Sequence, residues 1–211
     1  MPIDLATLLD PAHTAVVTME LQRGVVGDSS VVPAVAEEAA AQHVVEHTAE
    51  IVRAARAVGA RVVHCTAEFR ADRAGSALNA PLLRALAKGD PRPLIGSTEA
   101  AVVPELGPEP SDLISSRSHG LTPFPGTDLD QLLRNVGVRT IVATGVSLNV
   151  GIPGLVMVAV DLGYQVVVVT DAVAGIPREY GEAVLEHTIG ALATRSTTTD
   201  VVATWSQLQG P

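Results

Sequence analysis

The chain has 211 residues, a formal net charge of −9 and 47% hydrophobic residues, and its aromatic residues amount to only 2%. The length suits a single α/β domain, residues 1–211, with a core of Val, Ala, Leu and Ile. The negative charge and the scarcity of aromatic rings argue against nucleic acid as a partner. No apolar run approaches the roughly 20 residues of a membrane span, and no secretory signal is visible, so we expect a cytoplasmic protein without a membrane partner.

Short β-branched runs alternate along the chain with segments of helical spacing. Strands are predicted at 13–19, 61–66, 112–116, 140–143 and 164–170, with 197–204 as a candidate edge strand. Helices are predicted at 44–58, 79–87, 128–135, 152–162 and 177–193. Loops are expected at 23–33 and over most of 71–110, where a weak pattern this long suggests a lid or oligomer contacts. This order predicts an α/β fold with a mainly parallel, doubly wound sheet.

The stretch 139–154 joins a buried strand to a helix through a turn that contains Gly145. Such a turn places main-chain N–H groups and a helix N-terminus at the carboxyl edge of the sheet, where α/β folds bind ligands. A tight connection without a function is the alternative. Ser147 and Asn149 are interpreted first as caps of the helix and second as donors to a ligand.

Five segments of the chain, in order, resemble the isochorismatase-like hydrolases, which are also called cysteine hydrolases. They span nearly the whole chain and lie at 15–22, 62–69, 124–129, 142–151 and 163–174. The resemblance implies a three-layer α/β/α fold and a homo-oligomer, a dimer or a tetramer. It also implies hydrolysis of an amide or, as in isochorismatase itself, of a vinyl ether. A non-proline cis peptide of the family would fall at Val146–Ser147.

Amidases of this family use an aspartate, a lysine and a nucleophilic cysteine, and all three positions are changed in this chain. The aspartate position is Glu20, the cysteine position is Gly151, and the lysine position falls on or near Ser118, within 117–119. Gly151 has no side chain, so a thioester cannot form there. The one lysine, Lys88, lies in the weakly patterned middle segment, so an ordinary cysteine-amidase mechanism is excluded.

Glu20 is the main catalytic candidate, as an acid or base at the ligand edge, and a purely structural carboxylate is the alternative. Isochorismatases are similar in lacking the cysteine and relying on the carboxyl group. Ser118 could donate a hydrogen bond, and Arg117 or His119 could supply a cation for an anionic substrate, unless these residues form a solvated loop. Main-chain N–H groups from Val150 to residue 152 would stabilise an oxyanion or orient water.

Cys65 ends the second predicted strand and could face Glu20 as a displaced nucleophile, although a buried inert thiol is the preferred interpretation. The histidines form no metal-ligand pattern, and we predict neither a metal ion nor a cofactor. Two hypotheses on function follow. In the first, the protein hydrolyses a vinyl ether or C–N bond of a small polar molecule, with Glu20 as the acid or base. In the second, it is an inactive family member that serves as a ligand-binding or structural oligomeric protein.

Overall fold

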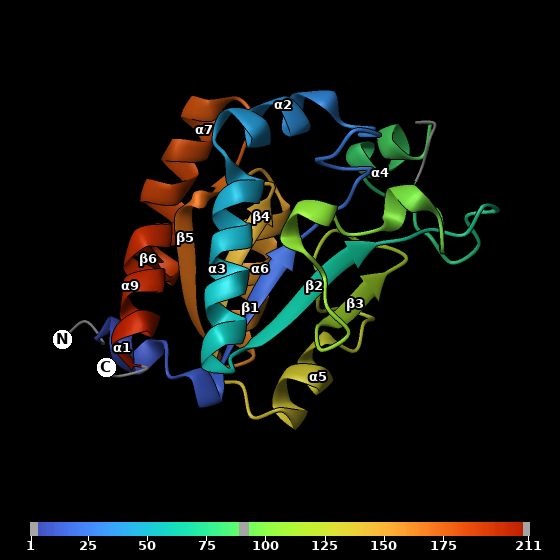
Figure 1. Cartoon of the computed structure of the whole chain (residues 1–211). Coiled ribbons are helices and arrows are strands. Elements are labelled where there is room, and N and C mark those ends of the chain that lie inside the picture. Colours follow the sequence, from blue (N-terminus) through green and yellow to red (C-terminus); the bar gives the residue numbers. More distant parts are fainter. Residues whose placement is uncertain (1–3, 89–92, 209–211) are drawn as a thin grey trace.

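The computed structural model describes residues 4–88 and 93–208, in which a single parallel sheet is flanked by helices (Figure 1). The strands lie in the order β3-β2-β1-β4-β5-β6, and each adjacent pair is parallel. Their bounds are β1 Thr14–Met19, β2 Arg61–Ala67, β3 Leu113–Arg117, β4 Thr140–Val146, β5 Gln165–Ala174 and β6 Thr194–Ser196. The predicted mainly parallel α/β fold is confirmed.

Helices cover both faces of the sheet, with α3 and α9 on one face and α6 on the other (Figure 1). The α-helices are α1 Leu5–Leu8, α2 Pro33–Ala41, α3 Val44–Val58, α4 Pro81–Leu86, α5 Leu129–Asn135, α6 Gly151–Asp161, α7 Arg178–Ala183, α8 Gly190–Leu192 and α9 Thr198–Leu208. Short 3₁₀ turns lie at Pro11–His13, Thr98–Ala100 and Pro104–Leu106, and a π-helical segment at Val184–Ile189. None of the described helices is long and apolar enough to span a membrane.

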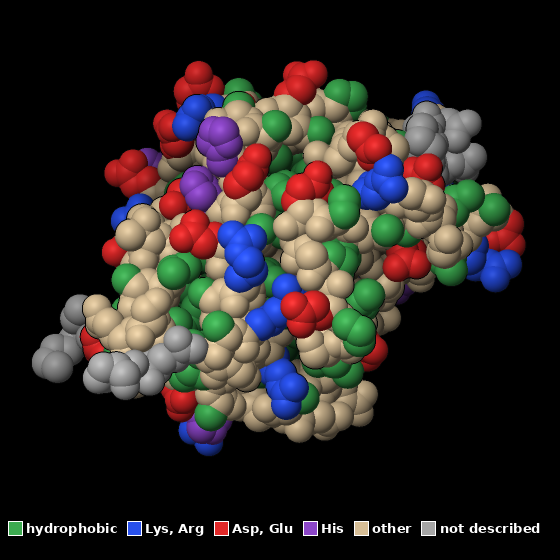
Figure 2. All heavy atoms as spheres, in the orientation of Figure 1, with side chains coloured by type: hydrophobic (Ala, Val, Ile, Leu, Met, Phe, Trp, Pro, Cys, Tyr) green, Lys and Arg blue, Asp and Glu red, His purple; other side chains and the backbone are tan. Residues whose placement is uncertain are grey.

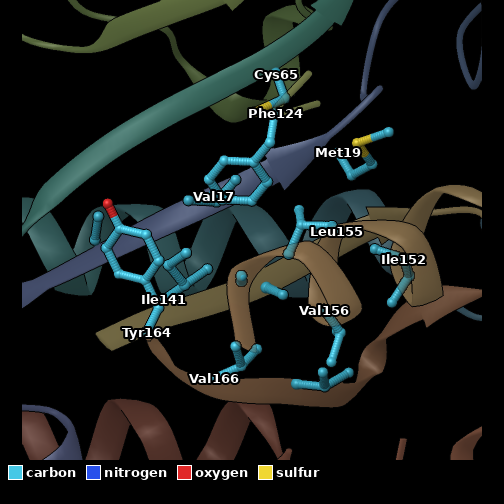
Figure 3. Close-up of a cluster of buried hydrophobic side chains, with 14 of the residues drawn as sticks. Val17, Met19, Cys65, Phe124, Ile141, Ile152, Leu155, Val156, Tyr164 and Val166 are labelled. Atoms are coloured by element: carbon cyan, nitrogen blue, oxygen red, sulfur yellow. The ribbon is translucent and has the colours of Figure 1, made fainter. Parts of the chain in front are cut away.

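The sheet separates two main hydrophobic clusters, because successive side chains of a strand point to opposite faces. In β1, Val17 packs with α5 and α6 in the cluster that Figure 3 shows, whereas Val16 packs with α3 and α9. All six residues of β1 are buried, as expected of a central parallel strand. Trp205 of α9 is fully buried, and its indole N–H donates to the Leu9 carbonyl at 2.9 Å.

The prediction of an edge strand at 197–204 is wrong, because that segment is helical. The edge strand is β6, and α9 begins two residues later. The run of threonines and valines has β propensity, but Thr198, Val201 and Trp205 lie at helical spacing and are all buried. The Thr197 hydroxyl also accepts from the Asp200 N–H at 3.2 Å, an N-terminal bond that favours the helix.

Other differences concern the lengths of elements. The strand predicted at 140–143 continues to Val146, so Gly145 lies inside β4 rather than in the turn after it, and β5 continues to Ala174. Helix α2 was not predicted and begins with Pro33 in its first turn. The helix predicted at 177–193 forms, but it contains the π-helical segment, where the Leu185 carbonyl accepts from Arg195.

Candidate active site

Glu20 lies where β1 ends, and its backbone has a φ of 53°, in the left-handed region that residues with a side chain seldom adopt. Its N–H donates to the Cys65 carbonyl at 2.9 Å, which ties the bend to β2. The buried Gln22 amide accepts from the Ala67 N–H at 2.7 Å and donates to the Ala67 and Ala100 carbonyls. An unusual conformation that several bonds hold in place is typical of functional sites.

Arg117 is the last residue of β3 and forms an ion pair with Glu20. Its Nη2 donates to Oε1 of Glu20, and its Nη1 donates to the Gly120 carbonyl at 2.9 Å. Arg117 is only 8% exposed. The pair therefore sets the side chain of Arg117 directly against that of Glu20 where β1 and β3 end.

Arg117, and not Ser118, contacts Glu20, so the structure does not bring Ser118 to the carboxyl group as the sequence analysis expected. Ser115 and Arg117 are buried, whereas Ser116 and Ser118 are exposed, because strand side chains alternate. Ser118 does not line the pocket described below. Its carbonyl accepts a hydrogen bond from the Ser76 hydroxyl at 2.7 Å and so holds the 71–88 segment against the end of β3.

His119 lines the pocket, as expected of a candidate substrate-binding residue. Its imidazole lies against Gly126, where an added Cβ would be 2.6 Å from Nε2 of His119. Gly126 also has a φ of 75°, so a glycine is needed there for both space and conformation. The loop after β3 is therefore folded back on itself and presents His119 to the pocket.

The turn between β4 and α6 contains the expected cis peptide at Val146–Ser147. Gly151 is the first residue of α6. A Cβ added to Gly151 would lie 2.9 Å from the Val146 carbonyl oxygen and 3.1 Å from Cε of Met19. The position therefore lacks a nucleophile and also lacks the space for one unless the backbone shifts.

The capping roles expected of Ser147 and Asn149 are wrong. The residue before α6 is Val150, and no side chain caps the helix. The Asn149 amide instead accepts from the Ile176 N–H at 2.8 Å and donates to the Ile176 carbonyl, so it joins this turn to the segment after β5. Ser147 and Val150 line the pocket, whereas Asn149 does not.

The main-chain donors of this turn are fewer than expected. The N–H groups of Val150 and Ile152 both donate to the Ser147 carbonyl, at 3.2 and 2.9 Å. Among the described residues, none accepts from the N–H of Gly151. Of the three expected oxyanion donors, Gly151 alone is available to a ligand.

Cys65 is 2% exposed and lies in the hydrophobic cluster with Met19 and Phe124 (Figure 3). Burial raises the pKa of the Cys65 thiol far above its usual range, and the nearby Glu20 carboxylate raises it further. Because the thiolate is the nucleophile, a thiol that stays protonated is unreactive. This agrees with the interpretation of Cys65 as an inert thiol.

These residues meet at a pocket beyond the carboxyl ends of the strands, with about 1030 Å³ of space, including its open mouth. Glu20, Arg117, His119, Ser147 and Gly151 form a polar floor. The opposite walls are apolar and come from the α2 and α4 regions, which lie beyond the tips of the strands (Figure 1); they include Val25, Val32, Val35, Leu78, Leu82 and Leu86. Leu121 lines the pocket, whereas Leu148 and Phe124 are buried in the hydrophobic core.

Sequence reasoning did not identify Arg73 or Phe69 as pocket residues. The Arg73 guanidinium lies over the Phe69 ring, 4.2 Å from its centroid, and both side chains line the pocket. Arg73 lies in the weakly patterned 71–110 segment, which carries no motif, and only the fold brings it to the strand ends. In the described part of the chain, no group of three or more His, Cys, Asp or Glu side chains could hold a metal ion.

Comparison with known proteins gives consistent results. The family model described as Isochorismatase domain matches residues 14–200. The Bacillus subtilis isochorismatase family protein YwoC is 37% identical over 100 residues, 47% of this chain and 52% of that protein, so the match spans about half of its length. Ureidoacrylate amidohydrolase RutB of Rhizobium rhizogenes is 28% identical over 78% of this chain and 71% of its own. An isochorismatase family protein from Burkholderia thailandensis superposes with a TM-score of 0.76 and 30% identity, covering 92% of this chain and 96% of the other.

Proposed function

Because this chain belongs to the isochorismatase family of hydrolases, we propose that it hydrolyses a small polar molecule without a cysteine nucleophile. The observation that carries the proposal is the ion pair of Glu20 and Arg117 on the pocket floor, beside Gly151. This arrangement supports a mechanism in which the Glu20 carboxyl group moves protons and no covalent bond to the protein forms.

Vinyl-ether cleavage suits a site of this kind, because the protein needs to supply only a proton. Protonated Glu20 would give its proton to the terminal vinyl carbon, and water would add to the resulting oxocarbenium carbon and return a proton to Glu20. The hemiketal would then collapse to a carbonyl compound and an alcohol. Glu20 must first take up a proton, and a substrate anion bonded to Arg117 would favour this by offsetting the guanidinium charge.

Hydrolysis of a C–N bond is the other chemistry that the site supports. The Glu20 carboxylate would act as a base and take a proton from the water that attacks the carbonyl carbon, and it would then give this proton to the nitrogen as the C–N bond breaks, leaving an acid and an amine. The free N–H of Gly151 would donate to the developing oxyanion. A relative, RutB, is named as an amidohydrolase, which supports including amides among the candidate substrates.

The alternative is an inactive family member that binds a ligand or has a structural role in an oligomer. The lack of space at Gly151 and an arginine in place of the lysine favour it, because an arginine cannot exchange a proton as a lysine can. The open pocket favours binding over a purely structural role.

Turnover of isochorismate, a vinyl ether, and of ureidoacrylate, an amide-type substrate, tests the proposal. We expect one of them, or a close analogue, to be hydrolysed, and Glu20→Gln to lower kcat/KM by about 100-fold or more, as is usual when an acid or base is removed. Glu68→Gln is the matched control, because Glu68 lies at the end of β2 and bonds Ser116 instead of lining the pocket. It should stay within about threefold of the unchanged protein.

Equal activity in the Glu20→Gln variant and the unchanged protein would exclude Glu20 as the acid or base. Binding of these compounds without any turnover would favour the inactive alternative. A thermal unfolding curve for each variant guards against a loss of folded protein.

A further inference from the structure

The charges that line the pocket differ in sign from the charge of the whole chain. Among the described lining residues, two guanidinium groups, Arg73 and Arg117, accompany one carboxylate, Glu20, whereas the chain has a net charge of −9. Figure 2 shows acidic side chains spread over the visible face of the molecule. A cleft with excess positive charge in a negative protein attracts anions and not cations.

Arg117 also has a donor that the protein does not use. Nη1 and Nη2 are bonded to Gly120 and Glu20, but Nε is buried and has no hydrogen-bond partner among the described residues. Nε and Nη2 lie on one edge of the guanidinium plane, and since Nη2 already donates to Glu20, Nε is the donor that remains for one oxygen of an anion. An unpaired buried N–H is unfavourable, so an anionic oxygen at this edge would satisfy it.

The walls of the pocket have the opposite character. Leu78 and Leu82 from the α4 region are 46% and 42% exposed, although both line the pocket. Val32 and Val35 face the pocket from the α2 region. An apolar group of a ligand would cover these side chains and remove them from water, a gain of roughly 25 cal/mol for each Å² buried.

We infer that the ligand of this pocket is an organic anion with an apolar body. Arg117 binds the anionic group through the Nε edge, Arg73 on the wall is the second cation, and the apolar body packs against the leucines and valines of the walls. The inference rests on the proposed function in taking this pocket as the substrate site, and it names the class of substrate.

Four probes of related structure test the inference by calorimetry on the full chain. 3-Phenylpropanoate has the charge and the ring, 3-phenylpropanamide lacks the charge, 3-phenylpropylamine reverses it, and propanoate lacks the ring. We expect 3-phenylpropanoate to bind roughly 10- to 100-fold more tightly than each of the others. One charge-assisted hydrogen bond accounts for such a ratio against the amide and the amine, and burial of the ring on the apolar walls accounts for it against propanoate. None of the probes is an ester or a vinyl ether, and the amide serves only as a binding control.

Variants identify the residues responsible. Arg73→Gln is expected to reduce the preference for 3-phenylpropanoate over 3-phenylpropanamide several-fold. Arg117→Gln is expected to abolish this preference. Arg70→Gln is the control, because Arg70 pairs with Asp72 at the surface and does not line the pocket. Since Arg117 is buried and its replacement could unfold the chain, Arg73→Gln alone suffices to decide the contribution of the wall.

Binding of the amide as tightly as the acid, or tighter binding of the amine, would overturn the inference. An unchanged preference in both arginine variants would overturn it too. Selective binding of 3-phenylpropanoate together with no hydrolysis of any tested substrate would uphold the ligand class while rejecting the proposed hydrolysis, so the two failures are distinguishable.

Discussion

Two arginine–carboxylate clusters of this protein, Glu20 with Arg117 and Asp112 with Arg56, differ in what surrounds them. In one, Glu20 and Arg117 face the pocket, and Nε of Arg117 has no partner among the described residues. In the other, Arg56 donates to the Asp112 carboxylate at 3.2 and 2.5 Å, and the buried His64 contacts the same carboxylate at 3.3 Å. The second cluster uses its donors and acceptors within the protein, whereas the first leaves some for a ligand.

The cluster around His64 superficially resembles a catalytic triad, because Nδ1 of His64 lies 2.8 Å from the hydroxyl of Thr18. Thr18 is 1% exposed, however, and none of the three side chains lines the main pocket. A hydroxyl that no substrate can reach is not a nucleophile. Unused hydrogen-bond donors and access to the pocket, rather than the types of residue, therefore distinguish a binding site from a structural network.

The largest effect on stability is expected from Asp112→Ala. Removal of this carboxylate leaves the Arg56 guanidinium and the His64 ring without their partner in a buried place, so the free energy of unfolding should fall by about 3 kcal/mol. Urea unfolding measures this. Glu20→Gln should change the same quantity by only about 1 kcal/mol, because the amide oxygen of the new side chain can still accept a hydrogen bond from Arg117.

An exposed ion pair provides the reference for these changes in the free energy of unfolding. Arg70 and Asp72 are both more than half exposed, so Asp72→Ala should leave the free energy of unfolding nearly unchanged. If Glu20→Gln proved as destabilising as Asp112→Ala, the pocket cluster would be a structural network like the other, and the contrast between the two would not hold.

Gly151→Ala tests how closely the backbone confines the pocket cluster. The added methyl group would lie 2.9 Å from the Val146 carbonyl oxygen, so we expect a loss of about 2 kcal/mol in the free energy of unfolding. Gly190→Ala is the control, since the nearest atom to its methyl group would be 3.5 Å away. Because Gly190 lies in a helix, Gly190→Ala should leave the free energy of unfolding unchanged or raise it slightly. Equal stability of the Gly151→Ala and Gly190→Ala variants would mean that the pocket floor has room for a side chain at position 151.

A smaller effect is expected from acid. Burial lowers the pKa of His64, although the Asp112 carboxylate opposes this. Burial alone would raise the pKa of Asp112, but hydrogen bonds from Arg56 and the Glu109 N–H, with the Arg56 charge, outweigh burial and lower it. Both groups therefore bind protons more weakly in the folded chain than in the unfolded chain, and acid favours unfolding.

This contribution to stability is complete above the unfolded pKa of histidine, about 6.5, and is lost as the pH falls through the lower folded value; Asp112 follows below about pH 4. The free energy of unfolding of the unchanged protein should be lower at pH 5 than at pH 7. In His64→Gln this difference should shrink, as urea unfolding at both pH values would reveal. An equal difference in both proteins would show that His64 is not the group that titrates.

Much of the fold could be predicted from the sequence, because the information is local. Apolar β-branched runs predicted the five long strands, and helical spacing predicted α3, α5 and α6 close to their observed bounds. The family itself could also be recognised, since the order and spacing of five segments match it, and the family model matches residues 14–200. The β propensity of 197–204 led to a wrong prediction of a strand. The segment is helical, because a helix buries Val201 and Trp205 and brings Trp205 to Leu9, near the other end of the chain.

The sequence by itself determined the parallel α/β architecture, the position of Glu20 at the end of a buried strand, and the absence of a side chain at position 151. Only the tertiary structure decided which cation meets Glu20, because Arg117 lies 97 positions away and strand alternation turns Ser118 outward. It likewise brought Arg73 to the pocket from a segment without any pattern. Strand and helix patterns follow from neighbours in the chain, whereas the partners in a site depend on side-chain direction and on contacts between distant segments.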